Sequence, residues 1–318
     1  MDAQHLPVLV EETLALLEPG RARGGHLFVD ATLGLGGHAE AILRASDQVR
    51  LVGIDRDPQA LELAARRLAP FGERARFVNA NFHQLASALA GIGITGGLSG
   101  GLSGVLADLG VSSMQLDTPE RGFSFRFDAP LDMRMGLAER TAADLVNEAS
   151  EGELEMIIRD YGEERQARRI ARSIVEARRE APIETTGQLK RLIDRVKGSR
   201  PFRGEKQRVD PATLVFQALR IEVNDELAGL EGFIQQAIDL LEDDGRLVII
   251  SYHSLEDRIV KNALRDRARG EIDQVTGRPH AETQVIEALT RKPIRPGDEE
   301  IARNPRSRSA RLRAARRI

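Results

Sequence analysis

The sequence predicts an α/β protein in which an open, mostly parallel sheet is interrupted by a mostly helical insert. Up to about residue 110, short apolar runs alternate with helical patterns, which is typical of strand–helix–strand units. From about 114 to 211 only helical patterns remain, and an apolar run returns at 246–251. We therefore expect a sheet domain made of residues 1–113 and 212–318, and an inserted domain at 114–211.

The composition is that of a soluble globular chain of 318 residues, with 41% hydrophobic and 30% charged residues. Cysteine is absent, which excludes disulfides, thiolate metal sites and cysteine nucleophiles, and we expect no metal site. No apolar run approaches the length of a membrane span, and the first residues, Met-Asp-Ala-Gln-His, lack a signal-peptide pattern. A cytoplasmic protein without a membrane segment is expected.

The elements of the sheet domain follow from apolar periodicity and from the residues that stop each run. The first helix lies within residues 5–18 and ends at Pro19-Gly20. We then expect strands at 27–30, 51–54, 76–79, 105–108 and 246–251, helices at 39–44, 60–68 and 84–90, and final strands at 284–289 and 309–313.

A low-complexity stretch precedes the fourth strand. Gly-Leu-Ser-Gly occurs twice in tandem, at 97–100 and 101–104. We interpret this stretch as a tolerated loop insertion without a functional site.

The insert is expected to consist of helices, with helical spacing at 141–149, 151–160, 164–180 and 186–197. Asp210-Pro211 has the form of an N-cap followed by a proline in the first turn. A long helical region with one apolar face then extends to Gly245.

Glycines join the first strand to the following helix. The turn Gly34–Gly37 permits positive φ angles and close approach of a ligand, and Asp55 ends the next strand, where an acid can hold a ribose hydroxyl pair. The pattern G-x-G-x-x-A at 34–39 also fits a dinucleotide, so NAD stays open. Asp30, at the end of the first strand, would repel a pyrophosphate but could receive an ammonium group, which favours S-adenosylmethionine.

Candidate catalytic groups follow two further strands. Asp108 ends the fourth strand and could accept a hydrogen bond from an adenine or substrate amine, while Gln115 could reach the cofactor from the entrance of the insert. Tyr252 and His253 follow the fifth strand at the same edge of the sheet. Structural roles, such as capping a turn, fit these residues about equally well.

The segment Gly122–Met135 contains three phenylalanines that alternate with Ser and Arg, in a chain with 4% aromatic residues. The rings could stack bases, and Arg126 and Arg134 could contact phosphates. A strand-like segment whose rings face the core is the favoured alternative. Asp128 and Asp132 could be acid–base groups or partners of the arginines.

The net charge of −3 is unevenly distributed. Residues 291–318 carry ten Lys/Arg and three acids, and residues 195–208 carry six Lys/Arg and one acid. Such tracts suit a localised phosphate-contacting face, and solvated segments without a partner are the alternative.

Several long motifs in fixed order resemble the ribosomal RNA small subunit methyltransferase H family, also called MraW, over essentially the whole chain. These motifs are His5-x-Pro-Val-Leu9, Asp30-Ala-Thr-Leu-Gly-x-Gly-Gly-His38, Asp108-Leu-Gly-Val-Ser-Ser113, Phe125-Arg-x-Asp-x-Pro-Leu-Asp-Met-Arg134, Gln217-Ala-Leu-Arg-Ile-x-Val-Asn224, Ser251-Tyr-His-Ser-Leu-Glu-Asp-Arg258 and Asn304-Pro-Arg-Ser-Arg-Ser309. The Gly-Leu-Ser-Gly repeat is not part of the family pattern.

The resemblance implies a class I methyltransferase (Rossmann-like) sheet with an inserted helical substrate domain. It implies methyl transfer from S-adenosylmethionine to the N4 amine of a cytidine in small-subunit ribosomal RNA, either naked or in the assembled subunit. The family's cofactor contacts fall here on Gly36, Gly37, His38, Asp55, Phe82, Asp108 and Gln115.

Many amine methyltransferases carry two prolines and an aromatic residue after the acid of the fourth strand, and Asp108-Leu-Gly-Val lacks them. The insert's phenylalanines or Tyr252 are therefore candidates for stacking on the base. We expect in-line positioning, with Asp108 and the carbonyls of Leu109 or Gly110 accepting the amine protons, and His253 or water taking the released proton.

Three alternatives stay open. They are a methyltransferase acting on a protein or small molecule, an NAD-dependent oxidoreductase, and a non-catalytic RNA-binding protein. The sequence leaves a homodimer open as well.

Overall fold

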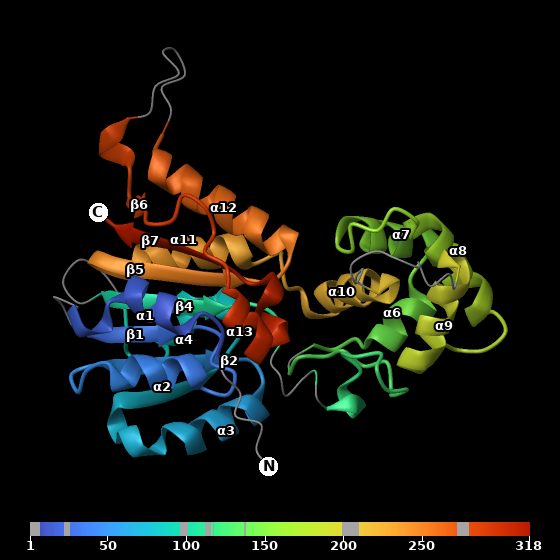
Figure 1. Ribbon diagram of the computed structural model, residues 1–318, viewed down its shortest axis with the longest axis horizontal. Coiled ribbons are helices and arrows are strands. Elements are labelled where there is room, and N and C mark those ends of the chain that lie inside the picture. The colour runs from blue at the N-terminus through green and yellow to red at the C-terminus, as the bar shows by residue number, and fades with distance from the viewer. Residues whose placement is uncertain are drawn as a thin grey trace. The chain divides into compact units, whose positions relative to one another are not determined.

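A computed structural model of the chain describes residues 7–21, 26–95, 101–111, 116, 118–136, 138–198, 210–271 and 280–318. Contacts divide the chain into two compact units, which we call the sheet unit (Met1–Gly110 with Leu227–Ile318) and the insert unit (Val111–Glu226). Figure 1 shows the insert unit in green to yellow. Within the described residues, no helix is both long and apolar enough to cross a membrane.

The sheet unit is built on seven strands in the order β3-β2-β1-β4-β5-β7-β6. Strands β1 to β5 pair in parallel, and β7 is antiparallel to both of its neighbours. This is the class I methyltransferase sheet, so the expected fold class is confirmed. The strands are β1 Leu27–Asp30, β2 Arg50–Asp55, β3 Ala75–Asn79, β4 Leu102–Asp108, β5 Leu241–Ser251, β6 Ile286–Ala288 and β7 Arg311–Arg317.

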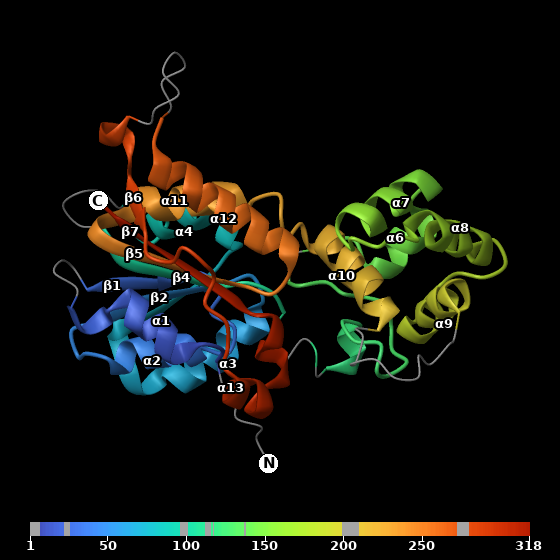
Figure 2. The same ribbon diagram turned by 45° about the horizontal axis from the view of Figure 1, so that its top comes forward.

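Alternate residues of the central strands are buried on opposite faces of the sheet. Val29 and Val105 pack on one face with α4, α11 and α12, whereas Phe28 and Leu106 pack on the other with α1, α2 and α3. Figure 2 shows these two helical layers on either side of the sheet. The helices of this unit are α1 Val10–Leu17, α2 Gly37–Arg44, α3 Pro58–Leu68, α4 Leu85–Ala90, α11 Leu230–Leu240, α12 Ser254–Arg269 and α13 Asp298–Arg303.

Strand β4 begins inside the tandem repeat, so the prediction of a loop is wrong for residues 102–104. Leu102 is fully buried, and a Cβ atom on Gly104 would lie 2.7 Å from ring atoms of Phe28. The second copy of the repeat therefore supplies the residues that a crowded strand needs. Residues 97–100, the first copy, lie outside the described residues.

Strand β5 begins at Leu241, where the sequence analysis expected helix until Gly245. Leu241 pairs with Leu102 and Arg246 pairs with Gly104, so four residues of β5 lie opposite one residue of β4. Such a bulge carries no helical or alternating pattern, which is why periodicity misplaced the boundary.

The insert unit consists of helices around one apolar core. Its helices are α6 Ala142–Glu148, α7 Glu151–Asp160, α8 Ala167–Arg178, α9 Thr186–Lys197 and α10 Pro211–Asn224. Thr141, Ser150 and Thr185 each begin a helix with a reciprocal capping box. The Asp210 side chain accepts a hydrogen bond from the Ala212 N–H, as expected for an N-cap.

Helix α10 belongs to the insert unit, whereas the sequence analysis assigned residues from 212 onward to the sheet domain. The long helical region expected there is two helices, α10 and α11, separated by residues 225–229. Val215 and Leu219 of α10 are buried in the core of the insert unit. The return to the sheet unit therefore follows α10.

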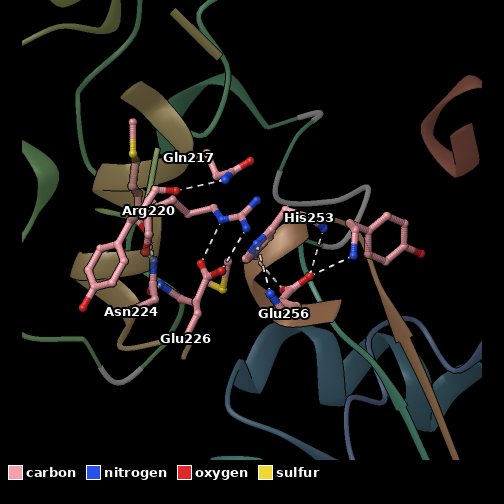
Figure 3. A network of polar contacts seen from close by, with 10 residues as sticks. Gln217, Arg220, Asn224, Glu226, His253 and Glu256 are labelled. Atoms are coloured by element: carbon pink, nitrogen blue, oxygen red, sulfur yellow. Dashed lines mark hydrogen bonds and ion pairs between the residues drawn. The ribbon is translucent and has the colours of Figure 1, made fainter. Parts of the chain in front are cut away.

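Helix α10 also holds the segment 118–136, which contains no strand. Asn224 accepts the Met135 N–H and donates to the Met133 carbonyl, both at 2.7 Å. In the same region the Arg220 guanidinium makes two 2.8 Å hydrogen bonds to the Glu226 carboxylate (Figure 3). The segment is thus fixed by side chains of a helix distant in sequence.

Candidate cofactor and catalytic site

The glycine turn connects β1 to the first residue of α2. Gly34 has φ +52° and Gly36 has φ +76°, so both occupy the left-handed region that favours glycine. Gly37 differs, because a Cβ atom there would lie 3.1 Å from the Pro7 ring. Two glycines thus shape the turn, and the third allows the lead-in segment to pack against it.

Asp55, at the end of β2, ties this turn to the sheet. Its Oδ2 accepts the Gly34 N–H and its Oδ1 accepts the Asp57 N–H, each at 2.8 Å. Burial raises the pKa of this carboxyl. Each carboxylate oxygen keeps acceptor capacity for a further donor, such as a ribose hydroxyl.

Asp108 lies at the centre of a partly buried polar cluster at the carboxyl edge of the sheet. Its Oδ1 accepts the Tyr252 hydroxyl at 2.9 Å, and its Oδ2 lies 3.7 Å from His38 Nδ1. The Asp108 N–H donates to the Thr32 hydroxyl at 2.6 Å. His38 Nε2 lies 2.8 Å from the Val8 carbonyl, so a neutral ring donates there and presents its bare Nδ1 to Asp108.

Two carboxyl groups of this edge, one buried and one half-buried, have no cationic Lys or Arg partner among the described residues. Asp30 is 1% exposed, and neither it nor Asp108 pairs with a Lys or Arg of the described residues. Burial raises the pKa of each carboxyl to about 7, and the pKa of His38 is lowered, also by burial. The edge is therefore poised to accept positive charge.

His253 begins helix α12 as its N-cap. Its Nδ1 accepts the Glu256 N–H at 3.4 Å, and its Nε2 lies 3.1 Å from Glu256 Oε1 (Figure 3). Glu256 Oε2 also accepts the Tyr252 N–H at 2.8 Å. Both nitrogens of the imidazole thus face Glu256, and the pair fixes the turn that carries Tyr252.

Tyr252 is half-buried, with its ring against the backbone of Gly110. A Cβ atom on Gly110, which has φ +109°, would lie 3.1 Å from the ring. Burial, and next the negative charge of Asp108, raise the pKa of the Tyr252 hydroxyl well above its usual value. The hydroxyl therefore stays protonated and donates to Asp108.

Phe82 follows β3 at the same edge and is half-buried. Its ring packs edge-on against Phe233, with 5.1 Å between centroids, and against His83 at 4.3 Å. Gln115, the other expected contact on the insert side, lies outside the described residues.

The sequence analysis did not single out Thr32, which holds the Asp108 backbone, or Val8, which holds His38. Thr32 lies inside the glycine-turn motif, and Val8 lies inside the motif His5-x-Pro-Val-Leu9. No spacing rule links either residue to the end of a strand. Tertiary contacts alone assign them these partners.

The donor set of this edge fits a ligand that carries an ammonium group and a ribose. Asp30 and Asp108 supply unpaired negative charge, and Asp55 supplies acceptors beside the open glycine turn. Three carboxyl groups at one edge would repel a pyrophosphate, as expected from the sequence.

A sequence profile of the MraW methylase family matches residues 2–318. A protein of Geobacter sulfurreducens named ribosomal RNA small subunit methyltransferase H is 51% identical over 327 residues, covering 100% of each chain. Proteins of the same name from Saccharopolyspora erythraea and Heliobacterium modesticaldum are 47% and 45% identical; the first match covers 99% of this chain and 94% of the relative, and the second 99% and 98%. The chain therefore belongs to the MraW methylase family of S-adenosylmethionine-dependent methyltransferases.

Proposed function

We propose that the chain transfers a methyl group from S-adenosylmethionine to the N4 amine of a cytidine in small-subunit ribosomal RNA. The observation that carries this proposal is the pair of carboxyls without a Lys or Arg partner among the described residues, the buried Asp30 and the half-buried Asp108, at the edge that holds the glycine turn. The shared name of the relatives supports the choice of ribosomal RNA. Because bacterial ribosomes are cytoplasmic, we propose that location too.

The residues of the sheet edge divide the contacts to the methyl donor. Asp30 would receive the ammonium group and Asp55 the ribose hydroxyls, because these carboxyls offer acceptors without a competing Lys or Arg pair among the described residues. The remaining contacts that the resemblance implies are Gly36, Gly37, His38, Phe82, Asp108 and Gln115. When bound, the sulfonium supplies an electrophilic methyl carbon and leaves as a neutral thioether.

Asp108 is the proposed acceptor for the cytosine amine. The N4 lone pair is delocalised into the ring, and an acceptor that holds the amine protons turns this lone pair toward the methyl carbon. The Tyr252 hydroxyl and the Thr32 hydroxyl hold Asp108 from two sides, so we propose both as positioning residues. The carbonyls of Leu109 and Gly110 follow Asp108 and are further candidate acceptors.

One amine proton must leave after the nitrogen–carbon bond forms. Asp108, His253 and water are the candidate acceptors. His253 would have to give up its cap on Glu256 to take the proton, because its Nδ1 accepts the Glu256 N–H. We therefore place Asp108 before His253 in this role.

The arginines of β7 contribute less to RNA binding than their number suggests. Arg313 pairs with Asp257 at 2.6 Å, and Arg316 pairs with Asp244 and Glu287, each at 2.7 Å. The exposed cations of the tract lie before β7, and they are Arg291, Lys292, Arg295, Arg303, Arg306 and Arg308. We propose that these, together with the tract at 195–208, contact phosphates.

Methyl transfer from tritiated S-adenosylmethionine to small ribosomal subunits, naked ribosomal RNA and total protein tests the proposal. Nuclease digestion followed by nucleoside analysis should place the label on N4-methylcytidine, and Asp108→Asn should remove it. Label in protein, in small molecules or on another nucleoside would contradict the proposal, as would the absence of any transfer.

A further inference from the structure

The three phenylalanines of the segment 118–136 have different surroundings. Phe123 is buried, and Phe125 packs on the core of the insert unit with its ring 4.9 Å from that of Phe216. Phe127 is 62% exposed, more than any other large hydrophobic side chain among the described residues. The expectation that the rings face the core therefore holds for two of the three.

The exposure of Phe127 does not come from a loosely held chain. The Thr186 hydroxyl donates to the Phe127 carbonyl at 2.8 Å and accepts the Ala129 N–H at 3.1 Å. Asp128 Oδ1 accepts the Gly187 N–H at 2.9 Å. The loop is thus fastened to the first turn of α9 at Phe127 and at the two residues that follow it, and this leaves the ring outside.

A phenylalanine held in water forgoes the stabilisation that burial of its ring would contribute. Single exposed apolar residues are common and need no explanation by themselves. Here, however, two neighbouring rings of the same segment are packed inside, and the hydrogen bonds of Thr186 and Asp128 hold the third outside. This arrangement suits a ring that meets a ligand.

Two arginines and one carboxylate, Asp128, flank the ring. Arg126 precedes it and is exposed, and Arg191 of α9 is 60% exposed with Nη1 3.9 Å from Asp128 Oδ2. The Asp128 carboxylate is already engaged by the Gly187 N–H. In sequence, α9 leads into the basic tract at 195–208. An exposed ring beside arginines is the composition that binds single-stranded nucleic acid.

We propose that Phe127 stacks on an unpaired base of the RNA substrate while Arg126 contacts an adjacent phosphate. This proposal rests on the proposed function and specifies which ring of the insert meets the nucleic acid. Tyr252, the other candidate, is half-buried with its ring against Gly110 and its hydroxyl bonded to Asp108. Stacking uses the face of any base, so Phe127 supplies affinity and placement, and base identity is left to groups that accept hydrogen bonds.

Substitution of Phe127 in the full chain tests the stacking. A fluorescein-labelled single-stranded RNA oligonucleotide of about ten nucleotides, containing cytidine, is the probe, and fluorescence anisotropy gives the affinity. Phe127→Ala should weaken binding by about 5- to 100-fold, which corresponds to the ~1–3 kcal/mol typical of one stacked base. Phe127→Leu should weaken it similarly, and Phe127→Trp should retain it.

Met156→Ala is the matched control, because Met156 is a half-exposed apolar side chain of the same unit. It should leave RNA affinity unchanged. All four variants should keep the thermal midpoint and the S-adenosylmethionine affinity of the parent chain, since the replaced side chains are exposed. Wild-type affinity in Phe127→Ala or in Phe127→Leu would overturn the proposal, the latter because it would show an apolar contact without stacking.

A parallel assay of methyl transfer to small ribosomal subunits separates this inference from the proposed function. If the parent chain methylates the RNA and Phe127→Ala raises KM by a similar factor with little change in kcat, both stand. If the parent methylates the RNA and Phe127→Ala does so with unchanged KM, only the stacking fails. If the parent methylates protein or nothing, the proposed function fails and this inference with it.

Discussion

Among the described residues, buried charges have partners of opposite charge inside the insert unit but lack them at the carboxyl edge of the sheet. In the insert unit, Glu164 pairs with Lys197, and Arg220 pairs with Glu226 through two 2.8 Å bonds. At the sheet edge, Asp30 is buried as deeply, yet no Lys or Arg of the described residues pairs with it. A buried charge with a partner indicates architecture, whereas one without a partner indicates a place that a ligand completes.

The contrast has a measurable cost in the ligand-free protein. Burial without a cation raises the pKa of Asp30 and Asp108 to about 7, so near neutral pH each carboxyl is divided between its charged and neutral forms. A cationic ligand favours the charged form. Binding of a cationic ligand therefore supplies the positive charge that the carboxyls of the sheet edge lack in the ligand-free protein.

The strongest test of this contrast is the substitution Asp108→Asn. Single-turnover methyl transfer should fall by about 10²- to 10⁴-fold, because the amide cannot accept as a charged group does. The parent rate should rise as pH increases through about 7, where Asp108 ionises, and the variant should lose that rise. Cofactor affinity is measured separately by calorimetry.

His253→Ala accompanies this experiment as the variant of the capping residue. Its rate should fall less than that of Asp108→Asn, because His253 engages Glu256. Near-normal rates in both variants would show that the acceptor lies elsewhere.

On the other side of the contrast, Arg220→Gln should destabilise the chain and leave the cofactor site alone. Removing this guanidinium takes two hydrogen bonds from the Glu226 carboxylate, whose side chain is 9% exposed, a loss of about 1.5–3 kcal/mol. Denaturant unfolding measures the stability, and calorimetry should find unchanged S-adenosylmethionine affinity. A large loss of cofactor affinity would remove the distinction between the paired and the unpaired charges.

Asp30→Asn should weaken S-adenosylmethionine binding by about 10- to 100-fold while making the ligand-free protein more stable at pH 8. The raised pKa means that the Asp30 carboxyl favours the folded state only while protonated. Its contribution is complete below the unfolded pKa near 3.8 and is lost as pH rises through about 7. Thermal unfolding between pH 5 and 8 should therefore show a smaller decline in the variant.

Asp47→Asn provides the control for Asp30→Asn, because the Asp47 side chain is fully exposed. It should change neither the pH dependence nor the affinity. Equal behaviour of the two variants would mean that burial at position 30 plays no part in binding.

The smallest effect on binding is expected from the basic tract at 195–208. Neutralising Arg203, Lys206 and Arg208, which lie outside the described residues, should weaken RNA binding by about 10-fold near physiological salt. The dependence of log affinity on log salt should lose roughly 2 from its slope, at about 0.7 per phosphate contact on single strands. Cofactor binding should be unchanged.

Arg316→Gln is the counterpart in β7, where the guanidinium pairs with Asp244 and Glu287. RNA affinity should change little there. An equal loss of RNA affinity per removed charge in the triple variant and in Arg316→Gln would show that only the total positive charge matters for RNA binding.

The sequence predicted the sheet well because each parallel strand carries two local signals, an apolar run and a polar residue that ends it. A run such as Leu51–Ile54 is apolar on both faces, and the polar residue that ends it lies at the edge where ligands bind. Asp30, Asp55 and Asp108 were found by this logic, and the structure places all three at the ends of their strands.

What the sequence did not predict depends on partners that are distant along the chain. No residue near Gly104 in the sequence indicates that it packs against Phe28, whose ring leaves no room for a side chain at position 104. Likewise, no residue near Arg313 indicates that it pairs with Asp257. The role of His253 as an N-cap depends on where α12 begins. A local pattern fixes where a residue lies along an element but not what it meets.

The tandem Gly-Leu-Ser-Gly copies have a consequence for how this gene can vary. Because the copies are identical, loss of either one leaves the same residues immediately before Val105, and β4 keeps both Leu102 and the glycine that clears Phe28. Removal or addition of one copy therefore changes the chain length by four residues without altering the sequence of the strand. Such a change lies at the opposite end of β4 from Asp108, the proposed acceptor.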